Sequence, residues 1–435
     1  MADVRPFAAL RYRTEAAGDL SAVLAPPFDV ISPEEHRTLL QSSPYNIVRL
    51  ELPRSADTAA DPYQAAGETL RAWRAQGVLA RDAEPALYLH EQEFDHEGRR
   101  LRRHVIFARL RLEPWEAGVI RPHEHTGPAD KEDRLRLLRA TRTNISPVFL
   151  LYRDPQGAVA SLAAGGAARP LAEATSPDGQ HHRLATLTDR DACAALSETF
   201  QRLTLYVADG HHRYETALAY RDECRLSAAA WAGEEPENFV LAGLTAAEDS
   251  GLLVLPIHRL LSLRPAPGSI DRLRQVFEAR GGGLLDMGAP LEAVLAATAT
   301  ASRKGAAFAA AGLEPGRFTL LTLRDQTKVD ALMPARPAAA WREVDAAILR
   351  YVVLEWGLGL PAAALDDAAA LTYSEDAEFA VREMLAGRRR LAFLLNPTPI
   401  DRILAVADGG ERMPRKSTFF HPKLPTGLVL NPLDL

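Results

Sequence analysis

Residues 203–219, LTLYVADGHHRYETALA, contain the junction that decides the local fold. The run LTLYVA is apolar enough for a buried strand, and it stops at Asp209. Gly210 gives the backbone the freedom to turn, and from Tyr214 onward apolar residues recur at helical spacing. The sequence therefore predicts a strand, a tight turn and a helix, in this order.

The same junction is the strongest candidate site. The turn places the backbone N–H groups of His211, His212 and Arg213 at a helix start, where unpaired amides and the helix dipole favour a phosphate. Arg213 adds a forked, permanently charged donor, and the two histidines titrate near neutral pH. Asp209 offers a carboxylate to magnesium or to a hydroxyl proton. The alternative is structural, with Asp209 capping the helix and the histidines satisfying each other, but several polar groups at the end of a buried strand favour a site.

A second polar cluster, RPHEHT, spans residues 121–126 and combines His123, Glu124, His125 and Thr126. Neighbouring prolines and glycine deny it a regular helix face, and no established zinc spacing fits. We interpret it as a loop that binds an anion or magnesium, with Glu124 as the preferred general base. A solvated turn is the alternative.

Two weaker groups of candidates lie near the ends of the chain. Near the N-terminus they are Asp29, Asn46 and Arg49. In the tail, residues 415–418 (Arg-Lys-Ser-Thr) resemble a phosphate-binding patch, although no glycine-rich Walker loop precedes them. A solvated turn is again the alternative.

The bulk composition is that of an ordinary globular protein. At 435 residues the chain exceeds the usual size of one hydrophobic core, so two or more packed units are expected. The net charge of −6 gives no general attraction to nucleic acid or anionic lipid, and we interpret the arginines at 99, 100, 102 and 103 as a solvated strand edge or turn. Without a signal-like N-terminus or a long apolar run, the expectation is a cytoplasmic protein with no nucleic-acid or membrane partner. A homodimer is a candidate assembly.

The local patterns predict an α+β fold, with mixed sheets and packed helices. We expect a first portion over 1–155, a second with the DGHHR box over 156–265, and a third over 266–435 whose tail packs back on the body. The expected helices begin at Ser32–Pro33, with a capping box, and cover 62–77, 189–202, 270–280 and 345–359. The expected strands include 46–53, a hairpin over 86–112, 181–189, 203–208 and 390–397, and 157–170 is expected to be a flexible loop.

An ordered series of motifs resembles the uncharacterised family called domain of unknown function 1015. The series is APPFDVIS (25–32), NIVRL (46–50), RPHEHT (121–126), DRL (133–135), NISPVF (144–149), ADGHHRYETAL (208–218), LPIHRLL (255–261), LAFLLNPT (391–398) and MPRKSTFFHPKLPTGLV (413–429). The resemblance spans nearly the whole chain. One departure is Phe28, where the pattern has tyrosine, so a role for that hydroxyl is in doubt.

The DGHHR box is also similar to the phosphate-binding box of the ParB/sulfiredoxin superfamily, especially to its free-serine kinases. This shorter resemblance implies a ParB/sulfiredoxin-like unit in which residues 210–213 hold the phosphates of ATP or ADP. Arg415 and Lys416, from the phosphate-binding-like patch of the tail, are further candidates for binding the nucleotide. The resemblance further implies that Asp209 and Glu124 bind Mg²⁺ or take the substrate hydroxyl proton and that His211 acts in catalysis. The residues assigned to the small-molecule substrate are Asp29, Asn46, Arg49, His123 and Thr126.

The implied function is a kinase for a small hydroxyl-bearing metabolite, with free L-serine as the first substrate to test. The alternatives are a metal-dependent phosphatase or other hydrolase, and a nucleotide sensor without turnover. The chromosome-partitioning ParB proteins carry glutamate and arginine in place of the two histidines, so a DNA-dependent switch is the weaker analogy.

Overall fold

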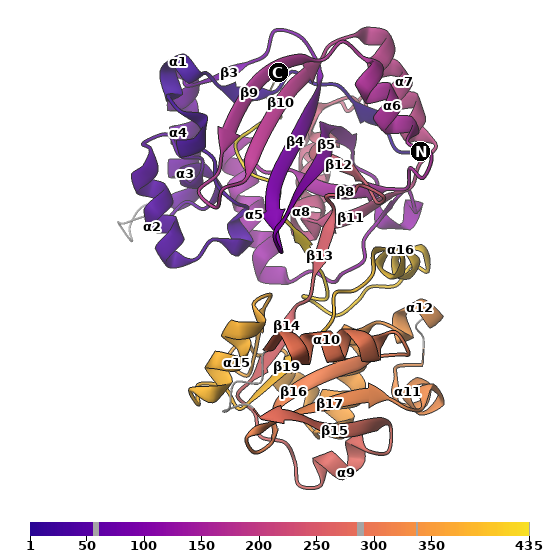
Figure 1. The fold of residues 1–435 in the computed structure, drawn as a ribbon. Coiled ribbons are helices and arrows are strands. Elements are labelled where there is room, and N and C mark those ends of the chain that lie inside the picture. Colours follow the sequence, from indigo (N-terminus) through magenta and orange to yellow (C-terminus); the bar gives the residue numbers. More distant parts are fainter. Residues whose placement is uncertain (55–60, 285–290, 336–337, 435) are drawn as a thin grey trace. The chain divides into compact units, whose positions relative to one another are not determined.

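The structure is a computed structural model that describes residues 1–54, 61–284, 291–335 and 338–434. The chain divides into two compact units (Figure 1). The first comprises residues 1–122, 126–253 and 422–435, and the second comprises residues 123–125 and 254–421. The end of the tail therefore belongs to the first unit, whereas the centre of the RPHEHT cluster belongs to the second. The boundaries expected after residues 155 and 265 stay a prediction.

The first unit is built on a nine-stranded mixed sheet. The strand order is β6-β11-β8-β12-β5-β4-β10-β9, and β1 pairs with β5. β11 runs parallel to β6, and β12 runs parallel to β8, whereas β11 runs antiparallel to β8. The strands are β1 (Val4–Arg5), β4 (Leu87–His96), β5 (Arg99–Arg111), β6 (Ile120–Arg121), β8 (Val148–Tyr152), β9 (Arg169–Thr175), β10 (His181–Leu187), β11 (Leu205–Asp209) and β12 (Phe239–Ala246).

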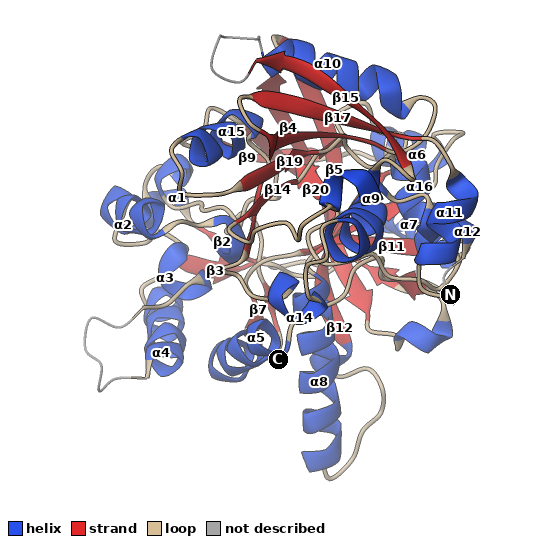
Figure 2. Cartoon of the chain, turned by 90° about the horizontal axis from the view of Figure 1, so that it is seen from below, coloured by secondary structure: helices blue, strands red, loops and turns tan. Residues whose placement is uncertain are grey.

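Helices bury apolar side chains against this sheet. Val159, Phe200 and Tyr214, from three different helices, join the core cluster that the strands form. Figure 2 shows α5 between α4 and α8, in agreement with the contacts that it makes with both. The helices are α1 (Thr14–Ala17), α2 (Pro33–Ser42), α3 (Val48–Glu51), α4 (Pro62–Ala75), α5 (Pro128–Thr141), α6 (Ala158–Gly165), α7 (Arg190–Gln201) and α8 (His211–Ser227). Short turns and ribbons complete the unit: η1 (Leu20–Ala22), η2 (Phe28–Val30), η3 (Trp115–Ala117), η4 (Pro236–Asn238), β2 (Leu10–Tyr12) with β3 (Leu79–Arg81), and β7 (Thr143–Asn144) with β21 (Asn431–Pro432).

The second unit contains a six-stranded antiparallel sheet in the order β15-β17-β16-β19-β14-β18. Side chains from α10 and α15 pack on its core cluster. Its strands are β14 (His258–Leu261), β15 (Phe277–Leu284), β16 (Ala307–Glu314), β17 (Arg317–Leu323), β18 (Leu371–Ser374) and β19 (Leu391–Leu394), and β13 (Leu253–Leu255) pairs with β20 (Phe419–His421). Its helices are α9 (Ser269–Leu273), α10 (Leu291–Ser302), α11 (Gln326–Leu332), α12 (Ala339–Arg342), α13 (Asp345–Ile348), the π-helix η5 (Leu349–Gly357), α14 (Ala362–Leu365), α15 (Ala377–Leu385) and α16 (Ile400–Asp408). Among the described residues, no helix has both the length and the apolar character of a membrane span.

Sheets combined with packed helices confirm the mixed α/β character. The capping box is confirmed as well, because the Ser32 hydroxyl accepts the N–H of Glu35 at 3.1 Å at the start of α2. The hairpin of β4 and β5 turns at Glu97 and Gly98, which both have positive φ.

Three local predictions are wrong. Residues 46–53 do not form a strand: the Asn46 side chain accepts the N–H of Val48 at 2.9 Å, which initiates the short helix α3. The expected loop after Gly157 contains α6, whose first amides donate to the Asp154 carboxylate. The expected helix over 270–280 ends at Leu273 because the chain then pairs with β17 as β15.

Candidate functional site

Gly210 alone connects β11 to α8, so the predicted strand, turn and helix are confirmed. Its φ of +87° lies in the left-handed region, where L side chains are strained, and its carbonyl accepts the Tyr214 N–H at 3.0 Å. A Cβ at this position would lie only 2.9 Å from Nε of Arg213. Gly210 therefore allows the backbone to turn, and its lack of a side chain leaves room for the Arg213 guanidinium.

Gly210→Ala is expected to lower the free energy of unfolding by about 1–2 kcal/mol through backbone strain, plus the cost of displacing Arg213. Urea unfolding measures the total. Gly77→Ala is the matched control, because Gly77 has a φ of +72° but no atom within 4 Å of the added Cβ. Equal losses in the two variants would show that the arginine contact at Gly210 has no cost.

Asp209, the last residue of β11, is enclosed by cations. Its Oδ1 lies 3.3 Å from Nζ of Lys423, and its Oδ2 lies 3.1 Å from Nη2 of Arg213. Burial raises the pKa of Asp209, but the charges of Lys423 and Arg213 outweigh burial and hold that pKa well below its usual range. Arg213 also donates to the carbonyl of Pro147. Asp209 is therefore a permanent carboxylate that fixes two cations.

A third cation, Arg103 of β5, adds to the field around Asp209. It is fully buried, lies over the ring of Phe149 at 4.9 Å and donates from Nη2 to Oε1 of Gln92 at 2.5 Å. Burial lowers the pKa of Arg103 to about 9, although the charge of Asp209 opposes the shift. The prediction that Arg103 belongs to a solvated strand edge is therefore wrong. Successive side chains alternate between the two faces of a strand, and the neighbouring Arg102 lies on the exposed face.

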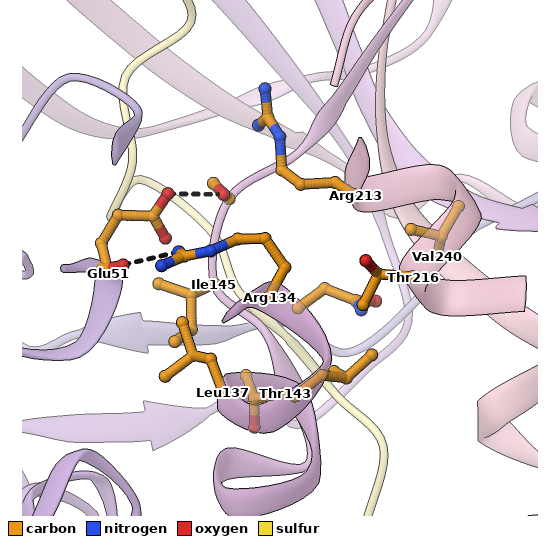
Figure 3. Close-up of a pocket in the computed structure, with 11 residues that line it drawn as sticks. Glu51, Arg134, Leu137, Thr143, Ile145, Arg213, Thr216 and Val240 are labelled. Carbon is orange, nitrogen blue, oxygen red and sulfur yellow. Dashed lines mark hydrogen bonds between the residues drawn. The ribbon is translucent and has the colours of Figure 1, made fainter. Parts of the chain in front are cut away.

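A small cavity of ≈ 50 Å³ opens beside Arg213, which is the one of these three cations in its lining (Figure 3). Its polar lining includes Glu51, Arg134, Ser146, Arg213 and Thr216. Figure 3 shows the Arg134 side chain pointing toward the main-chain carbonyl of Glu51, with Arg213 extending from the start of α8. A cavity of this size holds a few water molecules or one group of similar volume.

Glu51 is a fully buried carboxylate that the sequence analysis missed. Its Oε1 accepts the Ser146 hydroxyl at 2.9 Å, and its carbonyl accepts Nη1 of Arg134 at 2.7 Å. Burial raises the pKa of Glu51, although the charges of Arg134 and Arg213 oppose the shift. The Arg134 guanidinium in turn lies 4.0 Å from the centre of the Phe28 ring. The ring at position 28 thus stacks on an arginine, a contact that requires no hydroxyl.

The two histidines of the box differ in their surroundings. His211 is buried and close enough to Asp209 to contribute to the lowered pKa of that carboxyl. Nε2 of His212 accepts the backbone N–H of Gly127 at 2.8 Å, which requires that this nitrogen carry no proton. Thr126 donates to Glu215 of α8 at 2.6 Å. His212 and Thr126 therefore attach the start of α5 to α8.

The other candidates of the first unit lie near α2 and α3. Asp29 is exposed on η2. Asn46 is fully buried, and its amide donates to the carbonyls of Ala22 and Leu24 at 2.9 and 3.0 Å, which fixes the backbone. Arg49 donates to the Leu40 carbonyl at 2.9 Å. The contacts of Asn46 and Arg49 hold the local backbone in place. The substrate-binding roles of Asp29, Asn46 and Arg49 stay a prediction.

Glu124 and His123 lie in the second unit and hold the tail loop that carries Lys416. The Glu124 carboxylate accepts the N–H groups of Lys416 at 2.8 Å and Ser417 at 3.3 Å. The His123 carbonyl accepts the Met413 N–H at 2.7 Å. The structure thus places Glu124, Arg415 and Lys416 in one unit and residues 209–213 in the other.

Glu124→Gln is expected to lower the melting temperature, because the amide loses the charge that both N–H groups contact, at a cost of about 1–2 kcal/mol. Differential scanning calorimetry measures the change. Glu375→Gln, on the surface of the same unit, is the control. An unchanged melting temperature for Glu124→Gln would contradict a structural role.

Resident magnesium does not fit the residues expected to bind it. Each Oδ atom of Asp209 already faces a cation, and the Glu124 carboxylate already accepts two backbone N–H groups. Within the described ranges, no group of three or more His, Cys, Asp or Glu residues could hold a metal. No step is therefore assigned to a metal bound by these side chains.

Comparison with known proteins gives a family and several structural neighbours. A family model described as "Protein of unknown function (DUF1015)" matches residues 4–347. A conserved hypothetical protein from Pyrococcus furiosus is 14% identical, with a TM-score of 0.35 over 75% of this chain and 94% of that chain. A free serine kinase in complex with AMP is 13% identical, with a TM-score of 0.36 over 74% and 92%. SbnI from Staphylococcus aureus, truncated at its C-terminus, is 12% identical, with a TM-score of 0.35 over 74% and 87%. No curated protein sequence matches.

Proposed function

The chain belongs to the DUF1015 family of proteins of unknown function, and we propose that it is a small-molecule phosphotransferase. In this proposal the first unit, as a ParB/sulfiredoxin-like phosphate-binding unit, holds the phosphates of ATP or ADP at the start of α8. One phosphoryl group then passes to the hydroxyl of a small metabolite, and free L-serine is the first substrate to test.

The observation that carries the proposal is the excess of buried cationic donors around one carboxylate. Arg213, Lys423 and Arg103 all interact with Asp209. Nε of Arg213 and both Nε and Nη1 of Arg103 are buried and have no hydrogen-bond partner among the described residues. Buried charged donors without partners are costly, and phosphate oxygens would satisfy them in the geometry that guanidinium groups favour. The backbone N–H groups at the start of α8 also favour the binding of a phosphate.

Phosphoryl transfer requires from the protein mainly positioned charge and a proton acceptor. The substrate oxygen attacks phosphorus, the bond from phosphorus to the bridging oxygen breaks, and the nucleotide leaves with that electron pair. The hydroxyl proton goes to a carboxylate. Asp209 is a poor acceptor near neutral pH because its pKa is depressed, whereas Glu51 lines the same cavity as Arg213 and has a raised pKa. We therefore assign the proton to Glu51, and Asp209 to holding the cations.

The test is to incubate the purified full chain with ATP or ADP, magnesium and a pool of amino acids. Mass spectrometry detects phosphorylated products, and ³¹P NMR counts the nucleotide consumed. The expected result is one phosphorylated hydroxyl compound for each nucleotide converted. Free phosphate without such a product would instead establish a hydrolase. Nucleotide binding without any turnover would establish a sensor, and either outcome would overturn the proposal.

A further inference from the structure

A second, larger cavity lies wholly within the second unit. Its volume is ≈ 500 Å³, within the range of pockets that take small organic molecules. Arg259, Arg415 and Lys416 contribute positive charge to the lining, and apolar and aromatic side chains form another part of it. These include Leu349, Leu354, Leu371, Tyr351 and Tyr373.

Arg259 on β14 is the unusual member of this lining. It is 5% exposed, and it donates from Nη1 to the Ile257 carbonyl at 2.6 Å and from Nη2 to the Lys416 carbonyl at 2.8 Å. Two of its five N–H donors are thus used, and its guanidinium lies 4.7 Å from the centre of the Tyr373 ring. The charge of Glu124 also acts on it, although no carboxylate of the described residues lies within ion-pair distance. A buried guanidinium ordinarily has an anionic partner. Burial lowers the pKa of Arg259 to about 10, so it remains charged at neutral pH.

Basic residues outnumber carboxylates in the described lining, which contains Arg259, Arg350, Arg415 and Lys416 against the carboxylate Asp366. Arg350 contacts Glu355 at 2.6 Å and Asp366 at 3.1 Å, a group of one cation and two carboxylates with a net charge of −1. Lys416 has a φ of +59°, and the Glu124 carboxylate holds its N–H at 2.8 Å. The loop is therefore fixed with Lys416 and Arg415 in the same lining as Arg259.

We propose that this cavity binds a phosphate monoester with an apolar or aromatic body. The charge of a phosphate near −2 matches several cations better than a carboxylate would. Its oxygens accept the remaining N–H groups of Arg259, and the body packs along the leucine and tyrosine side chains. This site is independent of the transfer reaction assigned to the first unit.

Isothermal titration calorimetry of the full chain with phenyl phosphate tests the proposal. Arg259→Met is expected to raise the dissociation constant at least about tenfold, and Lys416→Met about threefold to tenfold. The exposed Lys304, also in the second unit, gives the control Lys304→Met, which should bind as the wild type does. Arg213→Ala, which alters only the phosphate site of the first unit, should retain this binding.

Several outcomes would overturn the proposal. If Arg213→Ala abolishes binding and Arg259→Met does not, phenyl phosphate binds only in the first unit. Benzoate binding as tightly as phenyl phosphate would contradict the preference for a phosphate. Inorganic phosphate binding equally tightly would contradict a role for the apolar lining. If Arg259→Met fails to fold, Lys416→Met decides, because its side chain is exposed. Absence of kinase activity would leave these results unaffected.

Discussion

Arg213→Ala is expected to raise the dissociation constant for ATP or ADP about 10- to 100-fold, the usual cost of losing a hydrogen bond to a charged group. Among the described residues, Arg213 is the one cation that lies at the start of α8, contacts Asp209 and also lines the small cavity. Titration calorimetry with each nucleotide measures the loss. Lys423 still faces Asp209 in the variant, so the carboxylate does not become isolated.

Arg225→Ala is the matched control for this variant. Arg225 lies on the same helix, α8, and its side chain is 58% exposed. Arg213→Lys should recover part of the affinity, because it restores the charge but not the fork of donors. If Arg213→Ala lowered the melting temperature but left the affinity for the nucleotide unchanged, the arginine would have only a structural role.

The sequence predicted the strand, turn and helix around Asp209, Gly210 and Arg213 because the deciding contacts there are local. Asp209, Gly210 and Arg213 lie within five residues of one another. An apolar run, a glycine and helical spacing follow in this order, which is enough to predict that they lie at the strand end, the turn and the helix start. The same local reasoning failed at Asn46, whose side chain starts a helix where alternation indicated a strand. A single hydrogen bond from a side chain to the backbone thus outweighed the periodicity.

The rest of the site depends on contacts between distant segments. Lys423 reaches Asp209 across 214 positions, the difference between the two residue numbers. Arg103 looked like one member of an exposed basic run, and only the register of β5 shows that it faces inward. Glu124 looked like a base because its loop is polar, but its carboxylate is used by the backbone of the tail. Spacing along the chain contains none of this information.

Glu51→Gln is expected to lower kcat about 10²- to 10⁴-fold, the usual contribution of a positioned general base, with little change in KM. Glutamine keeps the shape of the side chain and can still accept the Ser146 hydroxyl, so the fold should persist. Asp209→Asn is the informative comparison, because it should raise KM for the nucleotide by loosening Lys423 and Arg213. Equal kcat in the wild type and Glu51→Gln would exclude Glu51 as the base.

The pH dependence separates the two carboxylates independently of these variants. If Glu51 is the base, kcat falls about tenfold per pH unit below the Glu51 pKa, which burial places above the ordinary glutamate value. If Asp209 were the base, this fall would begin only below the ordinary aspartate range.

The pH dependence of stability gives a second measure of the Glu51 pKa. A raised carboxyl pKa means that the folded state binds the proton more tightly than the unfolded state does. That contribution to stability is complete below the unfolded pKa and is lost as pH rises through the folded pKa. Glu51→Gln should therefore gain stability relative to the wild type across this window, and urea unfolding at a series of pH values measures the gain.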